Sequence, residues 1–408
     1  MQRIELSTRN MGWRLLAVML LLAIGAAALS YGFMTLFSSD PGWAEIEADA
    51  GEMSYAGEFV FLYELGRGGT SSTTERKALT VLYTQATATA WKLFNNEEAV
   101  EGMPNIRYLN DHPNETVTVD AALYQALDRV ARSGDRTLYL APIAEVYNNL
   151  FLCEADELTV DFDPLLNPDL RGMFAELAAF ARTPEAINLE LMEDNQVCLR
   201  ISEAYLTYAA EQELSDLIDF QWMLNAFVID YLADELTSRG YTNGLLSSWD
   251  GYARALDQRT GSSYSLSIFD GQDGTARQAA VMAYSGARSI VSLRAYPMNN
   301  GDLRRFYVRR DGQIRVPYLD AADGLARAAW ADLTAYATDM GCAETLLNVI
   351  PVYVAESLSD EALTQLAGQG IQSVYCRDLV VRCTDESAVW KELYEGEDGA
   401  YTSLLIQP

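Results

Sequence analysis

The chain has 408 residues, with 29 Lys plus Arg against 58 Asp plus Glu, which gives a formal net charge of −29 at pH 7. This excess of carboxylates excludes proteins that bind nucleic acid regardless of its sequence, because their affinity for phosphate comes from clustered Lys and Arg. The single histidine, His112, excludes a metal site built on several histidines. Half of the residues are apolar, so most of the chain is expected to fold.

The segment 15–37 contains no charged residue and is long enough to span the roughly 30 Å hydrocarbon core of a bilayer. Arginines precede this segment, while the residues that follow it are acidic. The positive-inside rule therefore predicts a transmembrane signal-anchor at 15–37, with the tail 1–14 in the cytoplasm and the bulk of the chain outside. The alternative is a cleaved signal peptide, because the triplet 26–28 consists of alanines.

The first part of the exported chain begins without strong patterning. Residues 38–57 are acidic and indicate a stalk, and the folded domain is expected to start at residue 58. Residues 58–63 form an apolar run typical of a strand. Apolar residues recur with helical spacing over 75–93 and again over 119–131, which predicts two helices.

The middle of the chain contains the clearest local signals. Residues 187–191 and 197–201 alternate apolar and polar side chains on either side of a polar turn at 193–195, which predicts a β-hairpin with one buried face. A long, mostly apolar helix is predicted over 220–238, and Gly240 provides its C-terminal cap.

The C-terminal half mixes both kinds of element. Between residues 264 and 318, short strands alternate with turn-forming residues. The later predictions are strands at 330–337, 371–376 and 379–383, and helices at 342–350 and 360–366. This order of helices and antiparallel strands predicts an α+β fold, with residues 386–408 as a C-terminal tail.

Five cysteines are present, and none occurs in a Cys-x-x-Cys pair. The spacing therefore indicates neither a zinc ribbon nor a thioredoxin-type site. Buried single thiols are expected. The alternative, for a chain outside the membrane, is a disulfide between Cys376 and Cys383 on neighbouring strands.

Four motifs in order resemble one known family. The segment 218–230 reads IDFQWMLNAFVID, with Asp219 and Asp230 at the separation that the family shows. The other three matches are Leu109-Asn110, the glycine-spaced stretch from Leu236 to Gly244, and Tyr318-Leu319-Asp320 with Gly324. Over roughly residues 58 to 385 the chain resembles the bacterial FAD:protein FMN transferases, the ApbE-like flavin transferases.

The resemblance implies a flavin-transferase-like α+β domain at 58–385 in a protein of the bacterial cell membrane. The family's activity is Mg²⁺-dependent transfer of FMN from FAD to a Thr or Ser of a partner, typically an exported membrane flavoprotein subunit. FAD and Mg²⁺ are accordingly the expected cofactors, and that subunit or another cell-surface protein is the expected partner.

The family's motifs select candidate site residues. They assign Asp219 and Asp230 to catalysis, and Asn225 and Asp320 to cofactor binding. Tyr252 joins the cofactor-binding set because it belongs to a group of aromatics, with Trp222, Phe227 and Trp249, that are suited to stacking on a flavin. Glu344 and Asn348 fall on the family's metal-binding helix and lie four residues apart, so both oxygens share one helical face.

Each carboxylate also has a structural interpretation. Asp219 suits a helix N-cap, Asp230 a satisfied polar group on a buried helix, and Glu344 the first turn of a helix. Three arginines in the strand-rich half, Arg294, Arg304 and Arg305, are candidates for holding a phosphate or carboxylate, with surface ion pairs as the alternative.

The chain departs from the family where the chemistry takes place. The family's lysine falls on Asn225, its Gly-Gly pair on Gln221 and Trp222, and its loop histidine on Pro317. These changes predict the loss of a cation near the phosphates and an obstructed approach to the flavin.

Two functional hypotheses follow from these departures, and a third stands outside the family. The first is an active flavin transferase or FAD pyrophosphatase with a rebuilt site. The second, which the replacements favour, is a member whose FMN transfer is impaired or lost and which acts as a non-catalytic exported binding or assembly protein. The third hypothesis is an unrelated exported α+β sensor domain.

Overall fold

The computed structural model describes residues 41–407, apart from 50, 52, 68, 258–262, 272–273 and 397–398. The predicted membrane segment 15–37 lies outside the described residues. Among the helices that are described, none combines the length and the apolar character that crossing a membrane requires.

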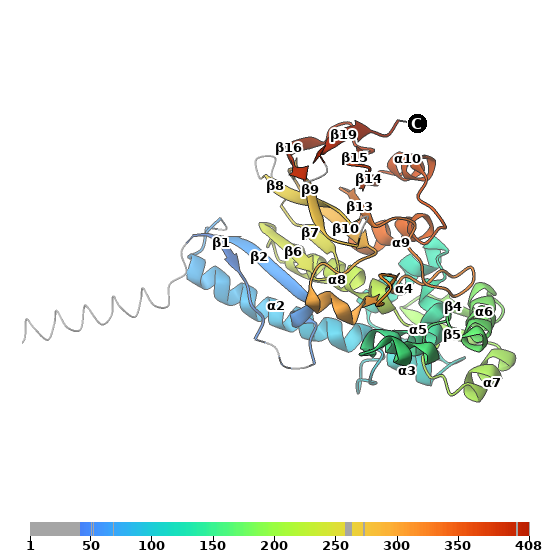
Figure 1. Cartoon of the computed structure of the whole chain (residues 1–408). Coiled ribbons are helices and arrows are strands. Elements are labelled where there is room, and N and C mark those ends of the chain that lie inside the picture. The colour runs from blue at the N-terminus through green and yellow to red at the C-terminus, as the bar shows by residue number, and fades with distance from the viewer. Residues whose placement is uncertain are drawn as a thin grey trace, which may run out of the picture.

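A sheet of nine strands forms the centre of the described chain (Figure 1). Its strands, in spatial order, are β1 Gly42–Glu45, β2 Phe59–Leu65, β6 Gly244–Ser248, β7 Tyr252–Ala255, β10 Arg288–Arg294, β13 Asp332–Ala337, β14 Gln372–Arg377, β15 Val380–Cys383 and β19 Thr402–Leu405. All neighbours are antiparallel except β15 and β19, which are parallel. The sheet therefore joins the first and last described strands of the chain.

Both faces of this sheet are covered, and the alternation of side chains along each strand decides which face a residue occupies. On β13, Leu333 and Ala335 belong to the main hydrophobic core, where α2 Ser72–Phe94, α8 Leu224–Ser238 and α9 Cys342–Tyr353 pack. Tyr336 points the other way, into a smaller core beneath a three-stranded sheet. That second sheet has the order β16 Val389–Leu393, β9 Arg277–Tyr284 and β8 Tyr264–Asp270.

A mostly helical lobe lies beside these layers, at the lower right of Figure 1. It contains a small sheet, in the order β3 Thr116–Thr118, β5 Gln196–Ile201 and β4 Ile187–Leu191. Its helices are α3 Ile106–Asp111, α4 Ala121–Ser133, α5 Ala141–Tyr147, α6 Pro168–Arg182 and α7 Glu203–Glu211. The lobe shares one continuous hydrophobic core with the helices on the central sheet.

Short elements complete the chain. The 3₁₀ helices are η1 Ala56–Glu58, η2 Thr137–Leu140, η3 Asn148–Leu152, η4 Asp156–Asp161, η5 Gln221–Met223 and η6 Asn300–Arg304. The remaining helix is α10 Asp360–Gly368, and the remaining strands are β11 Tyr307–Val308, β12 Ile314–Arg315, β17 Glu395–Gly396 and β18 Gly399–Ala400.

The predicted α+β class is confirmed, and most strongly periodic elements lie where they were expected. The hairpin pairs Leu189 with Leu199, as alternation predicts. The helix predicted over 220–238 is α8, with the single 3₁₀ turn η5 in front of it. Helices α5 and α6 were not predicted.

The two ends of the domain differ from their predicted boundaries. The stalk 38–57 contains β1, which pairs with β2, and the tail 386–408 contains β16 and β19, which pair with β9 and β15. Edge strands have one free side and few buried side chains, so they lack the apolar run by which buried strands are found. The domain therefore includes both segments.

None of the five cysteines forms a disulfide, and four of them are buried, as expected, whereas Cys153 is partly exposed. Cys376 lies opposite Val381, and Cys383 lies opposite Val374. The two cysteines are diagonal neighbours on one face of the sheet, and the alternative disulfide is not formed.

The contribution of the C-terminal segment can be measured with one substitution. Tyr401 is 5% exposed and its hydroxyl donates to Asp270 Oδ2 at 3.1 Å. Tyr401→Ala is expected to lower the free energy of unfolding by about 2–4 kcal/mol in urea titrations, because it removes a buried ring. Leu404→Ala, on the same segment but 47% exposed, serves as the control and should cost under about 0.5 kcal/mol. Equal, negligible effects of both substitutions would mean that the segment is not packed on the domain.

Candidate functional site

A pocket of about 450 Å³ opens between the helical lobe and the edge of the central sheet. Its wall is assembled from segments far apart in sequence, including η3, η5, the first turn of α8, the β6–β7 turn and η6. The lining residues used below are Tyr55, Glu58, Asn148, Gln221, Trp222, Asn225, Asp250, Tyr252, Arg294, Arg304, Arg305 and Tyr318. A volume of this size is within the range of small-molecule sites, roughly 300–1,000 Å³.

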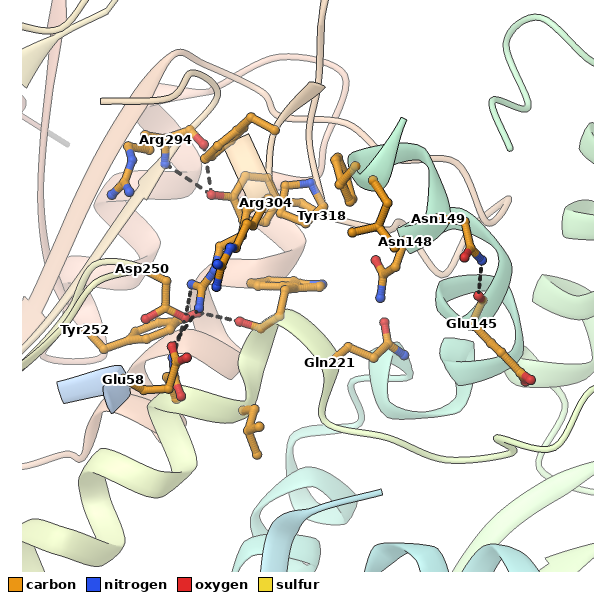
Figure 2. A pocket seen from close by; sticks show the side chains of 18 of the residues that line it. Glu58, Glu145, Asn148, Asn149, Gln221, Asp250, Tyr252, Arg294, Arg304 and Tyr318 are labelled. Atoms are coloured by element: carbon orange, nitrogen blue, oxygen red, sulfur yellow. Dashed lines mark hydrogen bonds and ion pairs between the residues drawn. The ribbon is translucent and has the colours of Figure 1, made fainter. Parts of the chain in front are cut away.

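One side of the pocket is a charge cluster in which two carboxylates surround Arg305. Its guanidinium lies 3.2 Å from Glu58 Oε2 and 2.5 Å from Asp250 Oδ2 (Figure 2). Asn225 Nδ2 donates to the same two oxygens, at 3.3 and 3.1 Å. Burial lowers the pKa of Arg305, and the Glu58 carboxylate acts in the opposite direction.

This cluster changes one conclusion drawn from the sequence. Asn225 was interpreted as the loss of a cation, because the lysine of the resembling family falls there. The guanidinium of Arg305 lies beside the Asn225 amide, since both contact Asp250 Oδ2. A positive charge is therefore present at this point, although two carboxylates already neutralise it.

The second part of the wall is aromatic. The Tyr252 hydroxyl donates to the backbone oxygen of Trp222 at 3.2 Å, and the Trp222 ring meets Tyr318 edge-on, with centroids 5.0 Å apart. The Tyr318 hydroxyl donates to the backbone oxygen of Arg294 at 2.8 Å. Burial raises the pKa of both tyrosines, so their hydroxyls stay protonated and act as donors. These bonds hold the rings in place.

Several buried polar atoms of pocket residues have no hydrogen-bond partner in the described structure. They are Gln221 Oε1, Trp222 Nε1, Asp250 Oδ1 and Arg294 Nε. Such atoms are uncommon in folded proteins, because an unpaired buried polar atom costs free energy. Four of them around one pocket indicate a wall that is adapted to a ligand.

Gln221 also has a strained backbone conformation. Its backbone φ is 54°, in the left-handed region that residues other than Gly, Asn and Asp seldom adopt. The side chain donates from Nε2 to the Thr137 backbone oxygen at 3.1 Å. In Figure 2 the carboxamides of Gln221 and Asn148 point toward each other across the pocket. Strained residues of this kind cluster at binding sites.

The three arginines of the pocket differ in their partners. Arg305 is neutralised as described, and Arg294 donates to Asp302 Oδ2 at 3.0 Å. Arg304 is exposed and forms no ion pair with a described residue. Arg304 is thus the guanidinium at this pocket that has no carboxylate of the described chain beside it.

Of the predicted site residues, Asn225 and Tyr252 line this pocket, while Asp219, Asp230, Asp320, Glu344 and Asn348 do not. Of the predicted aromatic group, Trp222 also lines it. Phe227 lies in the main core, and Trp249 is 63% exposed at a different cavity.

Asp219 lies two residues before η5 and does not line the pocket. Burial raises the pKa of its carboxyl to about 7, and the charge of Asp216 adds to the shift. The backbone amides of Gln221 and Phe220 act in the opposite direction, since they donate to the ionised form. The carboxyl therefore supports the strained turn at Gln221.

Asp230 has a structural role in α9. Its Oδ1 accepts the backbone N–H of Cys342 at 2.8 Å and its Oδ2 that of Ala343 at 3.0 Å, while Arg254 Nη1 lies 3.0 Å from Oδ1. The helix N-terminus thus receives a carboxylate. At Gly341, an added Cβ would lie 2.1 Å from Asp230 Oδ2, so the close approach requires glycine.

Asp320 also has local partners. Its Oδ1 accepts the backbone N–H of Ala322 at 2.8 Å, and Arg327 Nη1 lies 3.2 Å from its Oδ2. These contacts shape the loop that ends at Gly324, whose φ is 76°.

Glu344 and Asn348 lie four residues apart on α9, as predicted. Glu344 is exposed, and Asn348 Nδ2 donates to the backbone oxygen of Glu344 at 2.9 Å. Within the described part of the chain, no group of three His, Cys, Asp or Glu side chains is arranged to hold a metal ion. The two residues that the resemblance assigns to Mg²⁺ therefore belong to no such group in the described chain.

Sequence reasoning missed Glu58 and Asn148. Neither belongs to a motif, and each is placed at the pocket by packing between segments distant in sequence. The only sequence signal was Arg305, a rare cation in an acidic chain, whose buried charge requires carboxylate partners nearby.

The structural role of Asp230 can be tested by stability. Asp230→Ala is expected to lower the free energy of unfolding by about 3 kcal/mol, because Arg254 and two amides of α9 lose their partner. Asp128→Ala removes a surface ion pair with Arg132 and should cost under about 1 kcal/mol. Urea titrations measure both variants, and equal losses would contradict a buried cap.

The raised pKa of Asp219 makes a prediction about pH. The folded carboxyl keeps its proton up to about pH 7, whereas the unfolded one loses it near its ordinary value of 3.8. The folded state thus binds more protons between these values, and this group's contribution to stability falls as pH rises from about 4 to 7. The Asp219→Asn variant has no carboxyl to titrate at this position. The difference in free energy of unfolding between the variant and the unsubstituted protein should therefore shift in favour of the variant as pH rises over this range, by on the order of 1–3 kcal/mol.

The measurement is a series of urea titrations from pH 4.5 to 8. Glu193→Gln, in the exposed β4–β5 turn, is the control, and its difference from the unsubstituted protein should stay constant. A constant difference for Asp219→Asn as well would contradict the raised pKa.

The sequence matches no protein-family model and no curated protein. Solved structures do match. The chain is similar to the ApbE protein of Thermotoga maritima, with a TM-score of 0.52 and 14% identity over 86% of this chain and 97% of that one. It is also similar to the flavin transferase ApbE of Vibrio cholerae, with a TM-score of 0.53 and 13% identity over 88% of this chain and 98% of that one. The resemblance stated from the motifs is confirmed at the level of the fold, and this chain has the fold of the ApbE flavin transferases.

Proposed function

We propose that this protein binds a flavin nucleotide, FAD in the first instance, in the pocket between η3, η5 and η6, and that it does not carry out Mg²⁺-dependent transfer of FMN. The observation that carries the proposal is the arrangement of the pocket wall. Amides, aromatic rings and the Arg304 guanidinium surround one cavity, and among the described residues Arg304 has no carboxylate partner and several polar atoms of the wall have no hydrogen-bond partner.

Each part of that wall suits one part of a flavin nucleotide. The pyrimidine edge of the isoalloxazine offers hydrogen-bond donors and acceptors, which match the carboxamides of Gln221 and Asn148. Its flat ring system suits contact with Trp222 and Tyr252. The phosphates suit Arg304, because a guanidinium binds phosphate oxygens in a fork and Arg304 has no competing carboxylate among the described residues.

The same wall argues against the transfer reaction. That reaction requires a divalent cation to neutralise the pyrophosphate. Of the pocket carboxylates, Glu58 and Asp250 already share the Arg305 guanidinium, and Glu145 accepts from Ser215 and from the backbone N–H of Asp216. Glu344 is exposed, and neither it nor Asn348 lines the pocket. A flavin-binding protein without transferase activity accounts for both observations.

The location and the partner are part of the proposal. The uncharged segment at 15–37 supports a single-pass anchor in a bacterial cell membrane, with the domain outside. A flavin-binding domain held there is suited to assembly with an exported membrane flavoprotein subunit or another cell-surface protein.

The proposal is tested by titrating the purified full chain with riboflavin, FMN and FAD, with and without Mg²⁺, while flavin fluorescence is recorded. Saturable quenching by FAD is expected, with an affinity that Mg²⁺ does not change. Absence of saturation up to about 1 mM FAD would refute the binding site. Release of AMP after Mg²⁺ is added, measured by chromatography, would refute the loss of transfer.

A substitution locates the phosphates. Arg304→Gln is expected to weaken FMN and FAD about tenfold, near 1.4 kcal/mol, and to leave riboflavin unchanged because riboflavin has no phosphate. Arg310→Gln is the control, since Arg310 is an exposed arginine paired with Glu157 and does not line the pocket. An equal loss for all three ligands in Arg304→Gln would contradict a phosphate contact.

A further inference from the structure

A second cavity, of about 430 Å³, lies on the opposite face of the central sheet from α8 and α9. Its floor is formed by β6, β10 and β13, and β8 of the second sheet forms one side. The apolar residues of this sheet face, such as Ile290 and Tyr336, are covered by the second sheet. The cavity occupies the part of the same face that the second sheet leaves uncovered.

The floor of this cavity is lined with hydroxyl groups. Ser292 and Thr334 are paired across β10 and β13, and their side-chain oxygens are 3.1 Å apart. Ser247 on β6 and Ser267 on β8 add two more hydroxyls. A hydroxyl both donates and accepts, and its hydrogen can rotate to suit a ligand. The floor therefore offers several neutral hydrogen-bonding groups within one cavity.

The charged groups of the cavity are matched internally. Arg294 lies 3.0 Å from Asp302, and the Tyr296 hydroxyl donates to Asp332 Oδ1 at 2.5 Å. Burial raises the pKa of Asp332 to about 7, so this carboxyl is partly protonated at neutral pH and can itself donate. The cavity therefore presents an arginine already paired with a carboxylate and a carboxyl group that is only partly ionised.

Trp249 provides a flat apolar surface at the rim. Its side chain is 63% exposed, yet its Nε1 donates to the Gly57 backbone oxygen at 3.0 Å. Its own backbone oxygen accepts from Arg294 Nη2 at 3.3 Å. The indole is therefore held in one orientation while its face stays open. Met298, which is 38% exposed, also lines this cavity.

We infer that this cavity binds a neutral saccharide. A sugar ring presents hydroxyls around its edge and an apolar C–H face, and these match the hydroxyl floor and the open indole. An anionic ligand would find Arg294 already paired, and a cationic ligand would find Asp332 bonded to Tyr296. This site is separate from the flavin pocket, although Arg294 contributes to the walls of both.

The test is isothermal titration calorimetry of the purified full chain with three uncharged trisaccharides: maltotriose, cellotriose and chitotriose. At least one is expected to bind saturably, and Trp249→Ala is expected to weaken that binding at least tenfold. Trp43→Ala is the matched control, because Trp43 is 51% exposed on β1 and does not line the cavity. Its affinity for the sugar should equal that of the unsubstituted protein.

A second variant keeps the test decisive if Trp249→Ala fails to fold. Ser292→Ala removes one hydroxyl from the floor and is expected to weaken the same sugar severalfold, without changing FAD binding. The inference is overturned if no trisaccharide binds up to about 10 mM. It is also overturned if the sugar binds equally to Trp249→Ala and Trp43→Ala, or if a peptide binds the cavity and no sugar does.

Discussion

Helix α8 is buried on most sides, so each polar side chain that it carries inward requires a partner from another part of the chain. Two such residues, Asn225 and Asp230, lie about one and a half turns apart. Asp230 forms an ion pair with Arg254 of β7 and accepts hydrogen bonds from the first amides of α9, which fixes that helix against the sheet. Asn225 donates hydrogen bonds to Glu58 and Asp250, which fixes the start of β2 and the β6–β7 turn at the pocket.

The wall of the pocket is organised by the contacts of Asn225. Two carboxylates brought together on the buried side of Asn225 require a cation, and Arg305 supplies it from the loop after η6. The cluster holds together segments that are nearly 250 residues apart in the chain. The Arg305 guanidinium is engaged by both carboxylates, which leaves Arg304, the amides and the aromatic rings as the groups available to a ligand. A wall with these groups suits recognition of a flavin nucleotide better than metal-dependent chemistry on it.

Arg294 connects the two faces of the central sheet. It lies at the end of β10, where alternation places it on the face away from α8, and its guanidinium reaches Asp302 and the backbone of Trp249. The proposed flavin pocket and the hydroxyl-lined cavity therefore share a wall that is held by one side chain. The fold thus offers two chemically different surfaces, one with a guanidinium and rings and one with hydroxyls and an open indole.

The sequence by itself determined the elements whose signal is local, because a periodic pattern depends only on neighbours along the chain. The hairpin at Leu189 and Leu199 and the buried helix α8 were recognisable in this way, while the ordered motifs carried the resemblance to the flavin-transferase fold. The tertiary structure decided the rest: the edge strands β1 and β19, the use of Asp230 as a cap, and the pairing of Arg305 with Glu58 and Asp250. No local pattern records those contacts, since the partner of a buried charge is set by which distant segments packing brings together.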